Sequence, residues 1–179
     1  MKEVIFAMML WIHNATGYTI PEPPKLQYLS SFETKRFAYG CDLTPIPEES
    51  IDICSAKDFW DLDDMERKSV PLGLYDHEKK VIVINKDFLK SEAHDRSVIF
   101  HELVHHMQYT NGIYNTAKCF GTLEKEAYKL QDKWLQEKYG VKIYETIGIN
   151  ELMILLITTC REGMWHMRVP DPEYKYDRK

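Results

Sequence analysis

The distribution of apolar residues predicts a helix close to the start of the chain. Residues 3–15 place four side chains on one helical face at spacings of three and four: Met8, Trp11, Ile12 and Ala15. The apolar run that contains them also resembles the core of a signal peptide, but Glu3 cancels the charge of Lys2 and no small-residue cleavage site follows. We therefore expect a helix that packs on the rest of the domain.

The pattern then changes to one that predicts strands. A cluster of prolines ends the first helix and leads into an extended segment around residues 26–29, and residues 31–39 favour a short helix. Further on, residues 81–84 are Val-Ile-Val-Ile, a β-branched run typical of a strand. Because a polar, turn-like stretch precedes this run, residues 72–84 predict a β-hairpin.

Helical periodicity returns after the hairpin. One helix is expected to begin near Asp95, with Ser91 as an alternative N-cap, and to end at Asn111-Gly112. A second is expected over residues 122–139, where a glycine follows as the C-cap. A third, over residues 150–162, is apolar nearly all round, which predicts a buried helix.

These elements predict an α+β fold in a single domain over residues 1–179, with its core in residues 72–139 and a polar tail at 168–179. The composition is that of an ordinary soluble domain, with 44% hydrophobic and 28% charged residues. A net charge of −5 argues against nucleic-acid binding, and no segment is long enough to span a membrane. We expect a cytoplasmic location, or a periplasmic or secreted one if residues 1–15 are a signal peptide. The oligomeric state is left open.

The four cysteines limit the kinds of metal site that the chain can form. They lie far apart without a CxxC pair: Cys41, Cys54, Cys119 and Cys160. A zinc ribbon is therefore not expected. The cysteines are either buried thiols or members of one or two disulfides, and we favour free thiols.

The most informative stretch is an HExxH motif, His101-Glu102-Leu103-Val104-His105. Histidines four residues apart project from one face of a helix, so both rings can reach a single metal ion. Glu102 lies about 100° around the helix, close enough to hold and deprotonate a metal-bound water. His106 lies about 140° from His101, so we expect it to support the structure rather than to bind the metal.

A catalytic zinc ion uses three protein ligands and keeps one open position. The metzincin pattern HExxHxxGxxH would supply the third ligand as a histidine, but Gln108 and Asn111 occupy its glycine and histidine positions. A glutamate from the next helix remains, and Glu124 and Glu126 flank the buried stripe of that helix on opposite sides. Their spacing from His105 does not separate the two.

The segment HELVHHMQ followed by LEKEAYKLQDKWL resembles an uncharacterised bacterial and phage family of zincin-like proteins that are inferred to be metallopeptidases. The likeness covers residues 72–136. The order of hairpin, HExxH helix and Glu-Ala helix is more distantly similar to the minimal gluzincin core of ImmA/IrrE-type peptidases. In such cores the glutamate directly before the alanine is the ligand, so the resemblance implies Glu126. The chain departs from the thermolysin-like pattern at Leu130, where that pattern has an aspartate.

The motif and the resemblance together predict a zinc-dependent peptidase that acts on a peptide or protein substrate. His101, His105 and Glu126 would hold Zn²⁺, and Glu102 would activate the attacking water. The alternative is a zincin-like module that binds metal without turnover and acts in binding or sensing. The strand at residues 81–84 would offer an extended peptide a partner for main-chain pairing. Candidate donors to the developing oxyanion are Gln108, Tyr109 and Tyr114.

Overall fold

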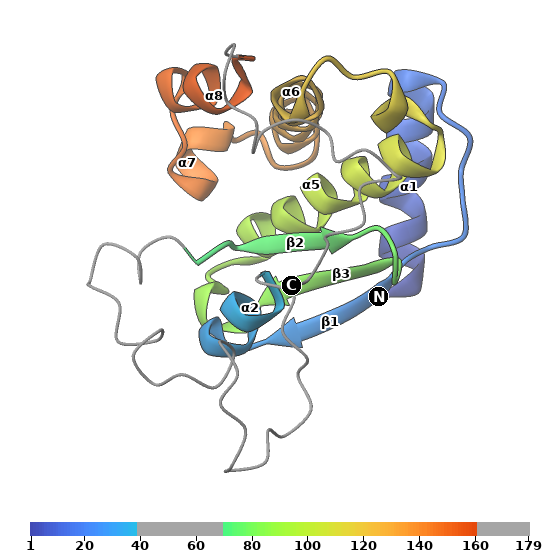
Figure 1. The fold of residues 1–179 in the computed structure, drawn as a ribbon. Coiled ribbons are helices and arrows are strands. Elements are labelled where there is room, and N and C mark those ends of the chain that lie inside the picture. Colours follow the sequence, from blue (N-terminus) through green and yellow to red (C-terminus); the bar gives the residue numbers. More distant parts are fainter. Residues whose placement is uncertain (39–69, 161–179) are drawn as a thin grey trace.

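A computed structural model describes residues 1–38 and 70–160, which form six α-helices and a three-stranded sheet (Figure 1). In chain order the elements are α1 (Lys2–Thr16), β1 (Lys25–Leu29), α2 (Ser31–Ala38), β2 (Gly73–Asp76), β3 (Val81–Asn85), the 3₁₀ turn η1 (Lys86–Phe88), α5 (Glu92–Thr110), the 3₁₀ turn η2 (Ile113–Asn115), α6 (Phe120–Tyr139), α7 (Ile143–Ile147) and α8 (Glu151–Thr158). The predicted α+β class is confirmed, whereas α7 is not among the predicted elements. The predicted tail at 168–179 lies outside the described residues.

The sheet has the strand order β1-β3-β2. β2 and β3 form the predicted hairpin and pair in antiparallel fashion, with Leu74 opposite Val83. β1 pairs with the other edge of β3 in parallel, with Gln27 opposite Val83, so the sheet is mixed rather than purely antiparallel. Because β3 lies between two strands, the prediction that residues 81–84 receive an extended peptide is wrong. Among the described residues, no strand pairs with the outer edge of β2, and β2 is the edge strand that contacts α5.

α1 confirms the predicted N-terminal helix and is part of the hydrophobic core. Its buried side chains are Ile5, Met8, Met9 and Ile12. This face packs against α5, where the Trp11 ring meets the edge of Phe100 with a centroid distance of 5.4 Å. Ala15, which was predicted on the buried face, is exposed. The helix ends before Gly17, whose φ of 80° is in the left-handed region where glycine is favoured.

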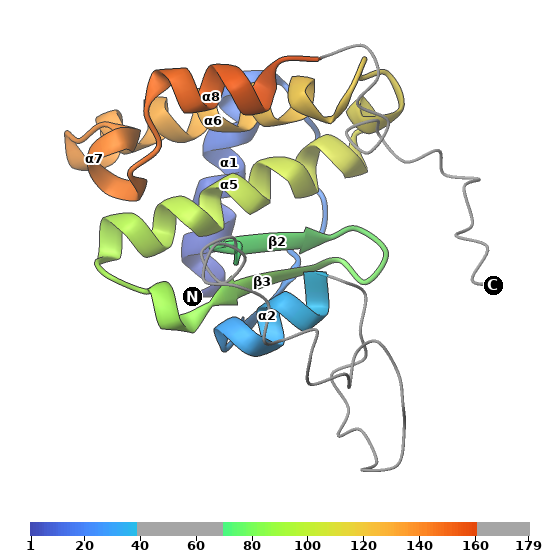
Figure 2. The same ribbon diagram turned by 60° about the vertical axis from the view of Figure 1, so that its left-hand side comes forward.

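α5 occupies the centre of the molecule, between the sheet and α6 (Figure 2). Ser91 is its N-cap and accepts a hydrogen bond from the His94 N–H at 3.2 Å. Asp95, the cap favoured from the sequence, lies inside the first turn instead. Phe100 stacks on Trp134 of α6 at 4.8 Å between ring centroids, so aromatic packing fixes one long helix against the other.

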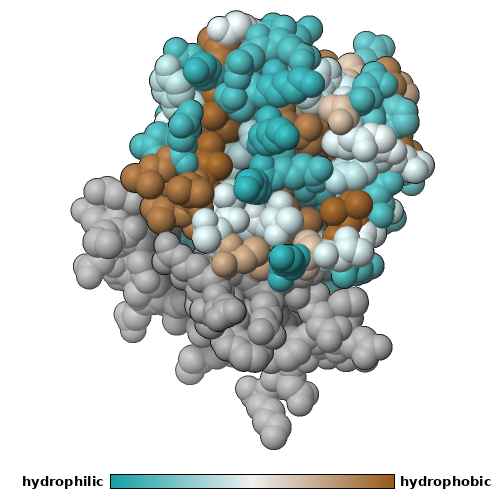
Figure 3. Space-filling view, turned by 90° about the horizontal axis from the view of Figure 1, so that it is seen from above, coloured by the Kyte–Doolittle hydropathy of each residue, from teal (hydrophilic) through white to brown (hydrophobic). Residues whose placement is uncertain are grey.

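α8 corrects the prediction of a buried C-terminal helix. Asn150 caps it as predicted, but the helix ends at Thr158, and the side chains of Leu152 and Leu155 are 64% and 60% exposed. α8 packs on α6 alone among its major contacts, so only one side of an apolar helix is covered. A hydrophobic area is visible at the α7–α8 side of the surface (Figure 3). No helix within residues 1–38 and 70–160 is long and apolar enough to cross a membrane.

A disulfide between Cys119 and Cys160 joins the start of α6 to the end of α8. The expectation of free thiols is therefore wrong for these two cysteines. The bond closes a loop across a separation of 41 residues. Cys41 and Cys54 lie outside the described residues.

Candidate metal centre

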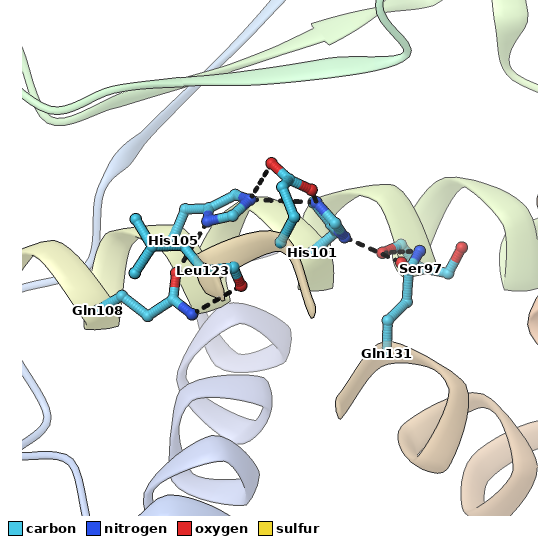
Figure 4. Close-up of polar contacts among 7 residues, drawn as sticks. Ser97, His101, His105, Gln108, Leu123 and Gln131 are labelled. Carbon is cyan, nitrogen blue, oxygen red and sulfur yellow. Dashed lines mark hydrogen bonds and ion pairs between the residues drawn. The ribbon is translucent and has the colours of Figure 1, made fainter. Parts of the chain in front are cut away.

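Three side chains from two helices converge on one point: His101 and His105 from α5 and Glu124 from α6. The Nε2 atoms of the two histidines are 3.1 Å apart, and each lies 3.2 Å from an oxygen of Glu124 (Figure 4). Donor atoms that bind one tetrahedral ion at about 2.0–2.1 Å are about 3.3 Å apart. The spacing of this cluster therefore fits a single metal ion.

The structure corrects the choice of Glu126 as the third candidate ligand. Glu126 is directed to the other side of α6, where its Oε2 accepts hydrogen bonds from the Tyr18 hydroxyl at 2.7 Å and from Gln108 Nε2 at 2.9 Å. Residues two positions apart on a helix point about 200° apart, so only one of the two glutamates can face the histidines. The way α6 crosses α5 turns Glu124 toward them.

Two buried glutamines hold the histidine rings, and the sequence analysis did not identify this role. Gln131 Oε1 accepts from His101 Nδ1 at 3.0 Å, and Gln108 Oε1 accepts from His105 Nδ1 at 2.9 Å (Figure 4). The orientation of the Gln131 amide is fixed by its nitrogen, which donates a hydrogen bond to the Ser97 carbonyl oxygen at 3.0 Å. A proton on each Nδ1 fits these contacts, and it turns the Nε2 atom of each ring toward the candidate metal position.

Glu102 lies beside this cluster at a close approach between α5 and β2. Its side chain is only 7% exposed. An added Cβ at Gly73 would lie 3.0 Å from Glu102 Oε1 and 2.8 Å from Val98 Cγ1, so the carboxylate occupies space that any larger residue in β2 would fill. Burial raises the pKa of Glu102, and the nearby charge of Glu124 adds to this effect.

The pKa values of His105 and Glu124 are shifted by the interaction of these residues with each other and with His101. Burial alone would lower the pKa of His105, but its hydrogen bond to Glu124 and the charge of that carboxylate outweigh burial and raise this pKa to about 9. Burial alone would raise the pKa of Glu124, but hydrogen bonds with His101 and His105 hold it well below its usual range. The cluster of two histidines and Glu124 is thus a donor set suited to a cation, and the charge of Glu102 lies beside it.

The cluster opens onto a cavity of about 530 Å³. Its lining includes aromatic rings: Tyr75, His77, Tyr109 and Tyr114. It also includes aliphatic side chains: Leu72, Val98, Ile147 and Ile149. Glu102 and the three candidate ligands line the same cavity. A substrate in the cavity would therefore contact aromatic and aliphatic side chains as well as the candidate ligands.

His106 and Gln108 have structural partners. His106 is fully buried, with Nδ1 2.8 Å from the Tyr75 hydroxyl and Nε2 2.9 Å from the Glu22 carbonyl oxygen, as expected for a residue that supports the structure. Gln108 donates both amide hydrogens, to Glu126 and to the Leu123 carbonyl oxygen at 3.0 Å, which leaves none for an oxyanion. All three predicted oxyanion donors, Gln108, Tyr109 and Tyr114, line the cavity, and only the two tyrosines have a donor hydrogen that is not already used by Glu126 or Leu123.

The fold and the cluster define an α+β protein with an HExxH-type candidate metal centre at the contact of two helices. The chain belongs to the family described as Domain of unknown function (DUF6647), whose model matches residues 42–167. The match contains the HExxH motif and α6, whereas α1, β1 and α2 precede it. Comparisons with curated proteins and with solved structures gave no significant match.

Proposed function

We propose that this protein is a zinc-dependent peptidase in which His101, His105 and Glu124 hold the metal. The observation that supports this proposal most directly is the convergence of these three side chains beside a buried glutamate in one cavity. Three protein donors leave a coordination position for water or substrate, as in catalytic zinc sites. A zinc ion in such a site lowers the pKa of water to about 7 and polarises a carbonyl group.

Glu102 is the proposed general base. It lies on the same helix as both histidines and lines the cavity with them. Its carboxylate takes a proton from the attacking water and then returns that proton to the nitrogen of the leaving amine. The raised pKa that burial gives to Glu102 suits both steps, because a base that also acts as an acid works best with a pKa nearer the operating pH.

Tyr128 is the proposed donor to the oxyanion that develops on the substrate. Its ring centroid is 4.5 Å from that of His101, and its side chain lines the cavity. Burial, together with the charges of Glu124 and Glu102, raises the pKa of Tyr128 above its usual range. The hydroxyl therefore keeps its proton at neutral pH and can donate it in a hydrogen bond.

The outer edge of β2 is the proposed docking edge for an extended peptide. The Asn85 N–H donates to the Leu72 carbonyl oxygen at 2.9 Å, which makes this pair a hydrogen-bonded one in the antiparallel ladder. Such pairs alternate, so the backbone groups of Gly73 and Tyr75 point away from β3 and toward the open edge. Both residues line the cavity, so a peptide paired there runs past Glu102.

We also propose that the protein works in an oxidising compartment. The proposal is supported by the disulfide between Cys119 and Cys160, because such bonds persist in oxidising environments and are rare in the cytosol. This proposal differs from the cytoplasmic location that the sequence favoured and agrees with the periplasmic or secreted alternative.

The test of the peptidase proposal is metal analysis and peptide-library hydrolysis on the full chain and on three variants. We expect about one zinc ion per chain, lost in Glu124→Ala and kept in Glu102→Gln. Glu102→Gln should reduce hydrolysis at least about 100-fold, because the base is removed while the metal stays. In Glu126→Ala the metal should still bind, though more weakly. A wild-type protein without bound metal would refute the site. Stoichiometric zinc without hydrolysis of any peptide would favour the alternative, a module that binds metal without turnover.

A further inference from the structure

We infer that Glu126 and Tyr18 are positioning residues that hold the ring of His105 through Gln108. This inference rests on the proposed metal site and extends it to a second layer of side chains. Glu126 is the acceptor at the centre of the arrangement, and neither it nor Tyr18 belongs to the candidate ligand set. The arrangement gives the carboxylate of Glu126 a role different from the ligand role that the sequence suggested.

The contacts form one continuous chain of hydrogen bonds. Tyr18 Oη donates to Glu126 Oε2 at 2.7 Å, and Gln108 Nε2 donates to the same oxygen at 2.9 Å. Gln108 Oε1 then accepts from His105 Nδ1 at 2.9 Å. Gln108 is 1% exposed, so water does not replace these partners freely. The two donor hydrogens of Gln108 and its acceptor oxygen are all in use, which leaves the side chain one orientation.

The negative charge of Glu126 strengthens the hydrogen bonds that link it to His105. A carboxylate that accepts from the Gln108 amide polarises it, and the amide oxygen becomes a stronger acceptor for His105 Nδ1–H. A stronger bond at Nδ1 makes Nε2 more basic and keeps the ring pointed at the metal. Burial and Glu126 together raise the pKa of Tyr18, so its hydroxyl remains a donor to the carboxylate.

Tyr18 is itself fixed by the segment that follows α1. Its carbonyl oxygen lies 2.7 Å from His13 Nδ1, and its N–H donates to Thr16 Oγ1 at 3.1 Å. The next residue, Thr19, exchanges two hydrogen bonds with the side chain of Asn111 at the end of α5, at 2.7 and 2.9 Å. The segment after α1 is thus hydrogen-bonded to the end of α5, the helix that carries both histidines. A residue outside the stretch that matches the family model thereby supports the metal centre.

The experiment compares metal affinity across a graded series in the full-length chain, by competition with a zinc chelator. Glu126→Ala removes the acceptor, Glu126→Gln removes only the charge, and Tyr18→Phe removes only one donor. The matched control is Glu137→Gln, on the same helix, where the carboxylate accepts from Trp11 Nε1 at 2.9 Å on the exposed surface. We expect zinc affinity to fall about 10- to 100-fold in Glu126→Ala, less in the two conservative variants, and not in the control.

Two further readouts separate positioning from a general structural effect. The absorption spectrum of the cobalt-substituted protein should shift in Glu126→Ala and stay unchanged in Glu137→Gln, because only the former alters a metal-binding ring. Thermal melting of the metal-free proteins shows whether each variant is folded, and Glu126→Gln and Tyr18→Phe provide the test if Glu126→Ala does not fold. Wild-type zinc affinity in all three variants would overturn the inference. A wild-type protein that binds no zinc would instead refute the proposed site.

Discussion

Replacement of Gly73 by alanine should lower both catalysis and folding stability, and catalysis should fall because the Glu102 side chain is displaced. The added methyl group would lie 2.8 Å from Val98 Cγ1 and 3.0 Å from both Cγ and Oε1 of Glu102. Ordinary carbon–carbon contacts are about 3.5–4.0 Å, so the Glu102 side chain has to move by about 0.5–1 Å. Overpacking of this size costs about 1–3 kcal/mol of folding stability.

The effect on turnover follows from the position of the general base. A displacement of about 1 Å in a reacting group can lower the rate about 100-fold, which is about 2.7 kcal/mol in activation free energy. The measurements are kcat/KM on a cleaved peptide, zinc content and urea unfolding. Zinc content should stay at the wild-type level, because the three atoms nearest to the added methyl group belong to Val98 and Glu102, and neither residue is a candidate ligand.

A matched control is Gly121→Ala, in which the new Cβ would lie 2.8 Å from the Thr158 carbonyl oxygen between α6 and α8. This clash is with the Thr158 backbone and lies away from Glu102, so the variant should lower stability at least as much as Gly73→Ala and leave the position of Glu102 unchanged. In the double variant Gly73→Ala with Val98→Ala, stability should recover in part while turnover stays low. Wild-type kcat/KM in Gly73→Ala would refute the argument that the position of Glu102 controls the reaction.

Two other predictions follow from the supporting contacts. Gln131→Met keeps the shape of the side chain but removes the acceptor for His101 Nδ1, so zinc affinity should fall about 10- to 100-fold in a chelator competition; an unchanged affinity would show that the ring is held by packing alone. Replacement of both Cys119 and Cys160 by serine opens the 41-residue loop, and the unfolding free energy measured with urea should fall by at most about 4 kcal/mol. The wild-type protein should lose similar stability in a reductant and the serine variant should not, and a wild type that is insensitive to reductant would contradict the disulfide.

Local physics made the helices and the hairpin predictable. The four-residue spacing of His101 and His105 places both rings on one helical face in any α-helix, and the cap at Asn150 depends only on neighbouring backbone groups. The strand at β3 follows from a β-branched run that is disfavoured in other conformations. These features need no information from distant parts of the chain.

The burial of α8, the pairing of β1 and the disulfide were less predictable, because each depends on distant parts of the chain. The apolar sequence of α8 does not show how many neighbouring elements pack against the helix. In the structure only one side of it is covered. β1 lies more than 50 residues before β3, yet it pairs with it in parallel. Cys119 and Cys160 pair because the packing of α8 on α6 brings their Cα atoms to 5.9 Å.

For the candidate metal centre, too, some residues follow from the sequence and others only from the tertiary structure. The HExxH motif fixed two donors and the buried Glu102 by helical geometry alone, whereas the choice between Glu124 and Glu126 depended on how α6 crosses α5. Both glutamates flank the same buried stripe, and only the tertiary structure turns one toward the histidines and gives the other Tyr18 and Gln108 as partners. Sequence determines which face of a helix a side chain occupies, but the packing of neighbouring helices determines what that face meets.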